Sequence, residues 1–132
     1  MKLLDTTVLV DLLRRQDKAR RIVLSMEEAG EPGGTTEVNA FELLMGTYRR
    51  GRSDPKKRTD VEKLLSRLEV LPLDRLGAGR AAEVLSKLRA DGEDIGLLDA
   101  LVAGIALASG YGTIVTRDEG FRRVPGLRVQ TY

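Results

Sequence analysis

The sequence predicts an α/β fold, in which a mostly parallel central sheet of about five short strands has helices on both faces. The first observation is an alternation along the chain of short apolar or β-branched runs with longer segments of helical periodicity. The second is that parallel neighbouring strands need crossover connections, which the intervening helices would supply. A chain of 132 residues has room for one folded domain, which we expect to span residues 1–132.

Five segments have the length and composition of strands. The first, Leu3–Leu4, is followed at once by Asp5. The second is brief, because it contains only Thr35 and Thr36 after two glycines that we interpret as turn residues. The remaining strands are expected at residues 69–73, 113–116 and 127–130, the last of them an edge strand.

Apolar residues recur at helical spacing between these strands. Asp54-Pro55 predicts a helix start, because Asp caps free amides and Pro is tolerated in the first turn, and Asp74 is expected to cap another helix. Small residues around Gly104 are expected to let their helix approach the sheet closely. The helices are expected at residues 8–15, 17–29, 38–50, 54–68, 74–92 and 98–108.

One helix, at residues 38–50, carries a pronounced apolar stripe. We expect this stripe to lie in the core, and contact of its edge with a partner helix is the alternative. The stripe consists of Val38, Phe41, Leu44, Met45 and Tyr48.

The composition restricts the chemistry that the chain can perform. It has no Cys and no His, which excludes disulfides, thiolate nucleophiles, Ser-His-Asp triads and zinc sites built on nitrogen or sulfur. Catalysis would therefore use oxygen ligands, Lys or bound water. No apolar run approaches the roughly 18 residues of a membrane span and the N-terminus does not resemble a signal peptide, so we expect a cytoplasmic protein that does not contact a membrane.

Four acidic residues are predicted to meet at one rim of the sheet: Asp5, Glu42, Asp99 and Asp118. Two of them follow predicted strands and the other two lie early in predicted helices, and ligands of open α/β sheets collect at the carboxyl ends of the strands. Carboxylates gathered in this way repel one another unless a cation joins them, and Mg²⁺ or Mn²⁺ prefers oxygen ligands. The pattern therefore predicts a metal site that hydrolyses a phosphate ester.

Each acid also has an ordinary structural explanation. Asp5 could cap a helix, Asp118 could be a turn residue, and Asp99 could favour a helix dipole. Glu42 could lie on a solvated helix margin. A common site is favoured because it replaces four separate coincidences.

Lys and Arg outnumber the acidic residues that remain when the four predicted site acids are left out. There are 22 Lys and Arg against 20 Asp and Glu, so setting the four acids apart leaves 22 − 16 = +6, which suits a polyanionic substrate. Solvated helix faces are the alternative explanation. One basic cluster is Arg14, Arg15, Lys18, Arg20 and Arg21, and the other is Arg49, Arg50, Arg52, Lys56, Lys57 and Arg58. Arg117, Arg122 and Arg123 lie near Asp118, where they could contact a substrate phosphate or a partner's carboxylate.

Several ordered motifs resemble one family. Residues 3–9 (LLDTTVL) and 39–46 (NAFELLMG) resemble the opening of a PIN-domain ribonuclease of the VapC toxin type. Residues 98–103 (LDALVA), 112–121 (GTIVTRDEGF) and 124–127 (VPGL) resemble the closing segment of that family. The likeness covers essentially the whole chain, but residues 53–92 match only in helical character.

The resemblance implies one PIN-like domain and a set of roles. Asp5, Glu42 and Asp99 would coordinate the metal, Asp118 would be a further acid, and Thr116 would be an accessory polar contact. The family implies RNA hydrolysis that depends on Mg²⁺ or Mn²⁺, a cognate VapB-type antitoxin that blocks the site, and a homodimer. Residues 53–92 leave the choice of RNA open.

Two other functions compete with the nuclease. A haloacid dehalogenase-type phosphatase also places Asp after its first strand, but it needs a second Asp two residues later, where this chain has Thr7. A non-catalytic RNA-binding or regulatory module would use the same acids only as helix caps, and a metal titration would distinguish it from the nuclease.

Overall fold

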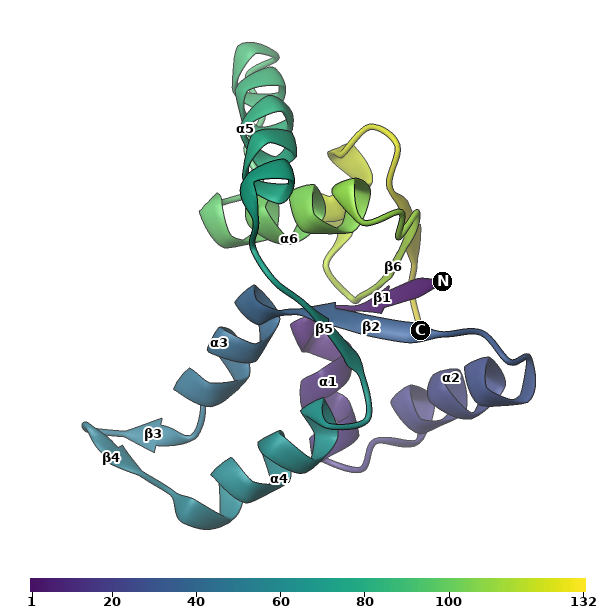
Figure 1. Ribbon diagram of the computed structural model, residues 1–132, viewed down its shortest axis with the longest axis vertical. Helices are drawn as coiled ribbons and strands as arrows, with labels where there is room; N and C mark the ends of the chain where they lie inside the picture. Colours follow the sequence, from purple (N-terminus) through teal and green to yellow (C-terminus); the bar gives the residue numbers. More distant parts are fainter.

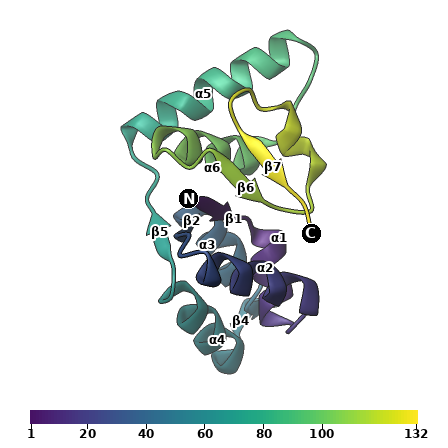
Figure 2. The same ribbon diagram turned by 90° about the vertical axis from the view of Figure 1, so that its right-hand side faces the viewer.

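The computed structural model describes residues 1–132 and confirms the α/β fold. All neighbouring strands of the central sheet are parallel, in the order β5-β2-β1-β6-β7. Figure 1 shows the sheet near the middle of the molecule, and Figure 2 shows it after a quarter turn. The strands are β1 (Lys2–Leu4), β2 (Gly33–Thr36), β5 (Glu69–Leu71), β6 (Thr113–Val115) and β7 (Arg128–Gln130).

Helices cover both faces of this sheet, as the sequence predicts. Figure 1 shows α5 and α6 above the sheet and α1, α2, α3 and α4 below it. The helices are α1 (Thr6–Leu13), α2 (Asp17–Glu28), α3 (Glu37–Met45), α4 (Pro55–Leu65), α5 (Arg75–Ala90) and α6 (Leu97–Ala108), with a short 3₁₀ helix, η1 (Glu119–Arg123), before β7. None of them has the length and apolar character needed to cross a bilayer.

The two faces of the sheet bury two separate cores. Leu3 of β1 packs on one face in a cluster with Val102 of α6, whereas Leu4 packs on the other face with Leu9 of α1. Successive residues of a strand point to opposite faces, so this one apolar pair contributes to both cores. β1 is therefore held by packing on both of its faces, so the backbone of Asp5, which follows it, has a fixed position.

The strand order places a switch point beside β1. After β1 the chain forms β2 and β5 on one side of it, and later forms β6 and β7 on the other side. Connections leave in opposite directions at such a point and open a crevice at the carboxyl ends of the strands. Asp5 follows β1 and Thr116 follows β6, so both residues lie at this crevice.

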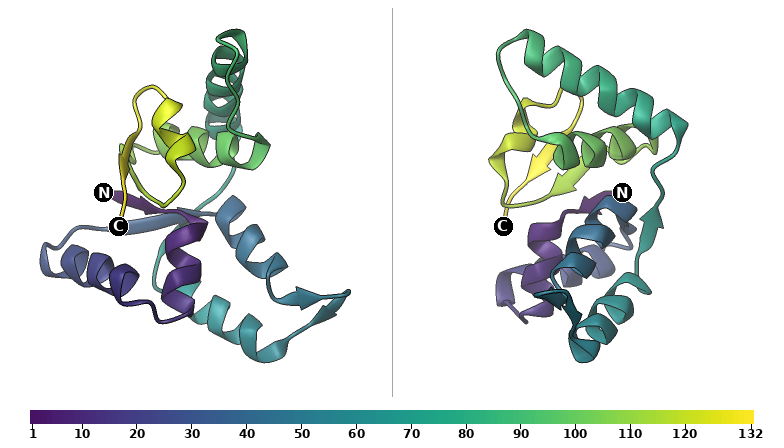
Figure 3. Two further views of the ribbon diagram at one scale, coloured as in Figure 1. Left: turned by 180° about the vertical axis from the view of Figure 1, so that it is seen from behind. Right: turned by 90° about the vertical axis from the view of Figure 1, so that its left-hand side faces the viewer.

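The helix predicted at residues 38–50 ends about one turn earlier in the structure. α3 ends at Met45, and the next residues form a small antiparallel hairpin of β3 (Tyr48–Arg49) and β4 (Arg52–Ser53). Its turn has a positive φ at Arg50 (51°) and at Gly51 (77°), which is the geometry of a two-residue hairpin turn. Figure 3 shows this hairpin extending from the body of the molecule.

The apolar stripe predicted at residues 38–50 lies in the core only in part, since Val38 is buried and Leu44 packs against the core, but its other three members are exposed. Phe41, Met45 and Tyr48 are 54%, 56% and 42% exposed, whereas Asn39 and Leu43 are buried. Helical periodicity identifies residues that share a face but not the face that meets the sheet. Here the capping contacts of Asn39 turn the other face inward.

The close approach predicted at Gly104 involves a helix rather than the sheet. A Cβ on Gly104 would collide with the backbone of Ala81, so this glycine lets α6 pack directly on α5. Gly33 and Gly34 are not turn residues, because they belong to β2. A side chain would not fit at Gly34, where a Cβ would lie 2.6 Å from the hydroxyl of Tyr111. The caps predicted at Asp54 and Asp74 are confirmed, because both side chains accept backbone N–H groups.

Candidate active site

Asp5 directly follows β1 at the switch point of the sheet and is 4% exposed. It is the N-cap residue of α1, yet its side chain makes no capping hydrogen bond. Its carboxylate instead accepts hydrogen bonds from Thr116 Oγ1 at 2.6 Å and Asn39 Nδ2 at 3.1 Å. The explanation of Asp5 as a simple helix cap is therefore wrong. Burial raises the pKa of Asp5, and the hydrogen bond from Thr116 partly opposes that rise.

Asn39 orients Asp5 from the first turn of α3. Its Oδ1 accepts from the hydroxyl and the backbone N–H of Thr36, while its Nδ2 donates to Asp5 and to Thr6 Oγ1. The Thr36 hydroxyl in turn accepts from the N–H of Asn39, which completes a capping box. The capping box that begins α3 therefore also orients the carboxylate of Asp5, which follows β1.

Thr6 connects the same assembly to Glu42. Its hydroxyl donates to Glu42 Oε1 at 2.8 Å, across 36 residues of sequence. Glu42 is half-buried on α3, one turn beyond Asn39. This hydrogen bond turns the Glu42 carboxylate toward the start of α1, so Glu42 is not a freely solvated helix margin.

A directed chain of hydrogen bonds reaches Asp5 from the β6 side. The backbone N–H of Arg117 donates to Thr7 Oγ1 at 3.0 Å, and Thr7 Oγ1 lies 3.2 Å from Thr116 Oγ1. Thr116 uses its only hydroxyl proton toward Asp5, so Thr7 must be the donor in the Thr7–Thr116 pair. The accessory polar contact expected of Thr116 is thus a direct bond to the central acid.

Asp99 lies in the first turn of α6 and faces the other three acids. Burial is the largest cause that raises its pKa to about 7, followed by the charges of Asp5 and Asp118. Glu42 contributes in the same direction. A helix N-terminus would favour the charged form of an acid, so desolvation and repulsion here outweigh the dipole. The dipole alone therefore does not explain Asp99.

Asp118 has a structural role as well as a place near Asp99. Its Oδ1 accepts the N–H of Gly120 at 2.8 Å and so caps η1, while its own N–H donates to Thr116. The interpretation as a turn residue is therefore correct in part. Its charge still acts on Asp99, so all four predicted acids belong to one electrostatic site.

The chemistry of this site fits a divalent cation. Every charged donor is a carboxylate oxygen, which hard cations such as Mg²⁺ and Mn²⁺ prefer, and a cation would offset the burial and the repulsion that raise the pKa of Asp99. No three of the acidic side chains lie close enough together to hold an ion as they stand. Binding would therefore require rotation of side chains about a backbone that already places them at one crevice.

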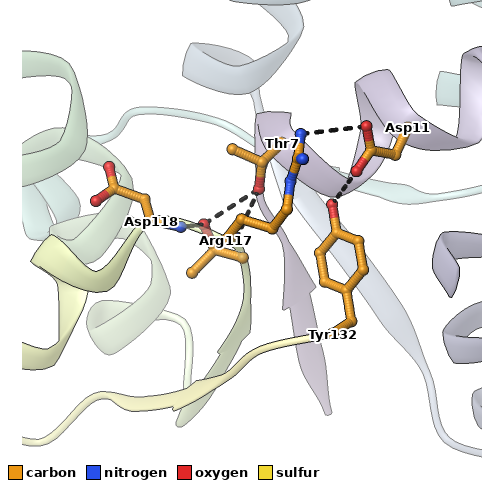
Figure 4. Close-up of polar contacts among 6 residues, drawn as sticks. Thr7, Asp11, Arg117, Asp118 and Tyr132 are labelled. Carbon is orange, nitrogen blue, oxygen red and sulfur yellow. Dashed lines mark hydrogen bonds and ion pairs between the residues drawn. The ribbon is translucent and has the colours of Figure 1, made fainter.

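A second polar cluster supports the site from behind, as Figure 4 shows. Asp11 of α1 is buried and accepts from Tyr132 Oη at 2.6 Å and from Arg117 Nη2 at 3.2 Å. Burial and the neighbouring Asp11 raise the pKa of Tyr132 to about 12. The cluster ties α1 and the segment after β6 to the residues after β7, and it anchors the Arg117 backbone that bonds Thr7.

The three arginines predicted near Asp118 all have partners within the chain. Arg117 is paired with Asp11, and Arg122 is paired with Glu119. Arg123 donates to the backbone carbonyl of Asp94 at 3.0 Å. Their contact with a substrate phosphate stays a prediction, and it would compete with these bonds.

Sequence reasoning missed the polar residues that hold the acids in place. No role in the site was predicted from the sequence for Asn39, Thr6, Thr7 or Asp11. A signal for Asn39 was present, since Thr36 stands three residues before it in the spacing of a capping box. No local sequence pattern indicates the role of Asp11, because its partners lie more than 100 residues away along the chain.

Comparison with known proteins identifies relatives of this architecture. The PIN domain family matches residues 2–127. The plasmid stability protein StbB of Pseudomonas syringae pv. tomato is 34% identical over 134 residues, covering 98% of this chain and 96% of that protein. The tRNA(fMet)-specific endonuclease VapC of Salmonella typhimurium is 27% identical over 97 residues, covering 74% and 73%.

A solved structure has the same fold over nearly the whole chain. The DNA-bound VapBC complex of Salmonella typhimurium contains a chain that matches with a TM-score of 0.85 and 25% identity. The match covers 98% of this chain and 96% of the other. The similarity therefore includes the sheet and both helical layers.

Proposed function

The chain belongs to the PIN domain family, and from that membership we propose that it is the VapC-type toxin of a toxin–antitoxin pair and hydrolyses RNA with the help of Mg²⁺ or Mn²⁺. The observation that carries this proposal is the electrostatic coupling of Asp99 to three other acids at the switch point of the sheet. Burial and the charges of the three neighbouring acids oppose the charging of Asp99, which a bound cation would favour.

Asp5, Glu42 and Asp99 would hold the metal, with Asp118 completing the site directly or through water. When bound, the metal would lower the pKa of a coordinated water and neutralise charge that develops on the scissile phosphate. Asn39 and Thr116 orient the carboxylate of Asp5, and Thr6 orients that of Glu42. The chain has no histidine, so its own residues supply oriented carboxylates rather than an imidazole base.

A protein partner would bind beside these acids. Phe41 and Met45 are exposed on α3 next to Glu42, and an apolar partner helix would remove them from water. An Arg or Lys of a VapB-type antitoxin would compete with the metal for the carboxylates. The solved DNA-bound VapBC complex of Salmonella typhimurium supports a partner of this kind. A homodimer and a cytoplasmic location stay predictions for this chain.

The direct test is cleavage of defined RNAs by the purified chain, with and without Mg²⁺. Transfer RNAs come first, because a relative is named as a tRNA(fMet)-specific endonuclease. We expect cleavage with Mg²⁺ or Mn²⁺ and none with a chelator. Binding of RNA without any response to metal would favour the non-catalytic module, and hydrolysis of small phosphate monoesters instead of RNA would favour a phosphatase.

A further inference from the structure

The small hairpin after α3 carries three arginines that have no partner in the chain. Arg49, Arg50 and Arg52, here called the basic hairpin, are exposed, and no ion pair or side-chain hydrogen bond engages any of them. Most arginines near the acids behave differently, since Arg117 and Arg122 are paired with carboxylates. The basic hairpin therefore presents uncompensated positive charge.

The geometry of the basic hairpin is unfavourable for the free protein. Arg49 lies directly opposite Arg52 in the antiparallel pair, and like charges at such positions repel. Arg50 has a φ of 51°, a left-handed conformation in which Gly, Asn and Asp are the usual residues. Both features reduce stability, and an anion bound between the guanidinium groups would relieve the repulsion.

The surface at the basic hairpin is hollowed and continues toward the acids. A hollow of about 720 Å³ is lined by the three arginines and by Ser53, Asp54 and Pro55. A second hollow of about 500 Å³ shares Asp54 with the first and reaches Glu42. Lys56, Lys57 and Arg14 line this second hollow together with the carboxylates of Asp54 and Asp60, so three cations and two acids flank the path to Glu42.

We propose that the basic hairpin, together with Lys56 and Lys57, binds backbone phosphates of the RNA strand on one side of the scissile bond and directs that strand along the two hollows to Glu42. This inference rests on the proposed ribonuclease function. A polar, arginine-lined hollow suits a polyanion better than an apolar peptide. The chain has only five aromatic residues, so phosphate contacts rather than base stacking would dominate the binding.

The test is the affinity of a labelled single-stranded RNA measured by fluorescence anisotropy in a chelator, where no metal-dependent hydrolysis proceeds. The double variant Arg50→Gly/Arg52→Thr removes two charges with residues that suit the turn and the strand, so its Tm should not fall. The matched control is Arg20→Gln/Arg21→Gln on α2, which Figure 1 shows on the opposite side of the molecule from the hairpin. Both variants lose the same net charge.

We expect the hairpin variant to bind RNA about tenfold more weakly, with a salt dependence shallower by roughly 0.7 for each phosphate that the variant no longer neutralises. The control should retain the affinity of the parent within about twofold. Equal weakening in both variants would reduce the effect to net charge and overturn the inference, as would unchanged affinity in the hairpin variant. Loss of antitoxin binding with RNA affinity intact would instead assign the surface to a protein.

The failure of this inference can be distinguished from failure of the proposed function. If the parent cleaves RNA and the hairpin variant has the same KM, kcat and salt dependence, only the hairpin assignment is wrong. If the parent neither binds nor cleaves any RNA, both are wrong.

Discussion

Replacing Asp99 with Asn should make the protein more stable while it abolishes RNA cleavage. Burial is the largest cause that raises the pKa of Asp99 from 3.8 to about 7, and the charges of Asp5, Asp118 and Glu42 add to the rise. An amide of the same shape carries no charge, so Asp99→Asn removes the repulsion and the desolvation cost together. It also removes one proposed ligand of the metal.

The size of the gain follows from the shift in pKa. A rise of about three units corresponds to an upper limit of about 4 kcal/mol at a pH above 7, where Asp99 is charged in both the folded and unfolded states. Since Asp99 is only half-buried, solvent screening reduces this limit, and we expect about 1–2 kcal/mol. For a domain of this size that gain raises the Tm by roughly 3–8 °C.

The pH dependence gives the prediction its sign. A raised pKa means that the folded state takes up the proton first, so the parent gains stability as the pH falls from about 8 through 7 toward 3.8. Asp99→Asn lacks this gain. The variant should therefore melt well above the parent at pH 8 and close to it at pH 5, as measured by circular dichroism.

Glu27→Gln is the matched control, because Glu27 is exposed on α2 and also carries one negative charge. Its stability should stay within about 0.5 kcal/mol of the parent. If Asp99→Asn melts at or below the parent at pH 8, the acids are not crowded as described. If it cleaves RNA at the parent rate with Mg²⁺, Asp99 is not a metal ligand.

Further predictions concern the other acids, the supporting cluster and the cell. Glu42→Gln should nearly abolish cleavage, whereas Asp118→Asn should be milder and partly restored by raised Mn²⁺; equal loss without recovery would contradict these graded roles. Asp11→Asn should lower the free energy of unfolding in urea by about 1–3 kcal/mol and bring the pKa of Tyr132 down from about 12, and an unchanged tyrosine absorbance titration would refute the contact. Induced expression of the parent should arrest growth, Asp5→Asn should not, and equal growth of both in several hosts would count against a toxin.

Much of the fold could be predicted from the sequence because the strands and helices differ in length and period. Leu3–Leu4 and residues 113–116 are short, apolar or β-branched, and bounded by polar residues. Their place at the switch point follows from alternation of strands and helices, and the acids that follow them were located for the same reason.

The errors arose where local pattern does not determine the surroundings. The stripe through Phe41 and Met45 has the period of a buried helix face, but the contacts of Asn39 with Asp5 and Thr36 turn it outward. The hairpin at Arg50-Gly51 interrupts a segment in which helical spacing continues to Tyr48. The partners of Asp11 come from the other end of the chain, which no local pattern reports.

The most direct test of the central claim, that the four acids form one cation site, is a calorimetric titration of the RNA-free protein with Mn²⁺ at pH 6.5. Burial and the neighbouring acids raise the pKa of Asp99 to about 7, so part of the Asp99 population is protonated at this pH and metal binding should release protons. We predict one saturable set of sites in the parent, heat that depends on the ionisation enthalpy of the buffer, and loss of both in Asp5→Asn. Identical binding curves for the parent and Asp5→Asn, without proton release, would contradict the account.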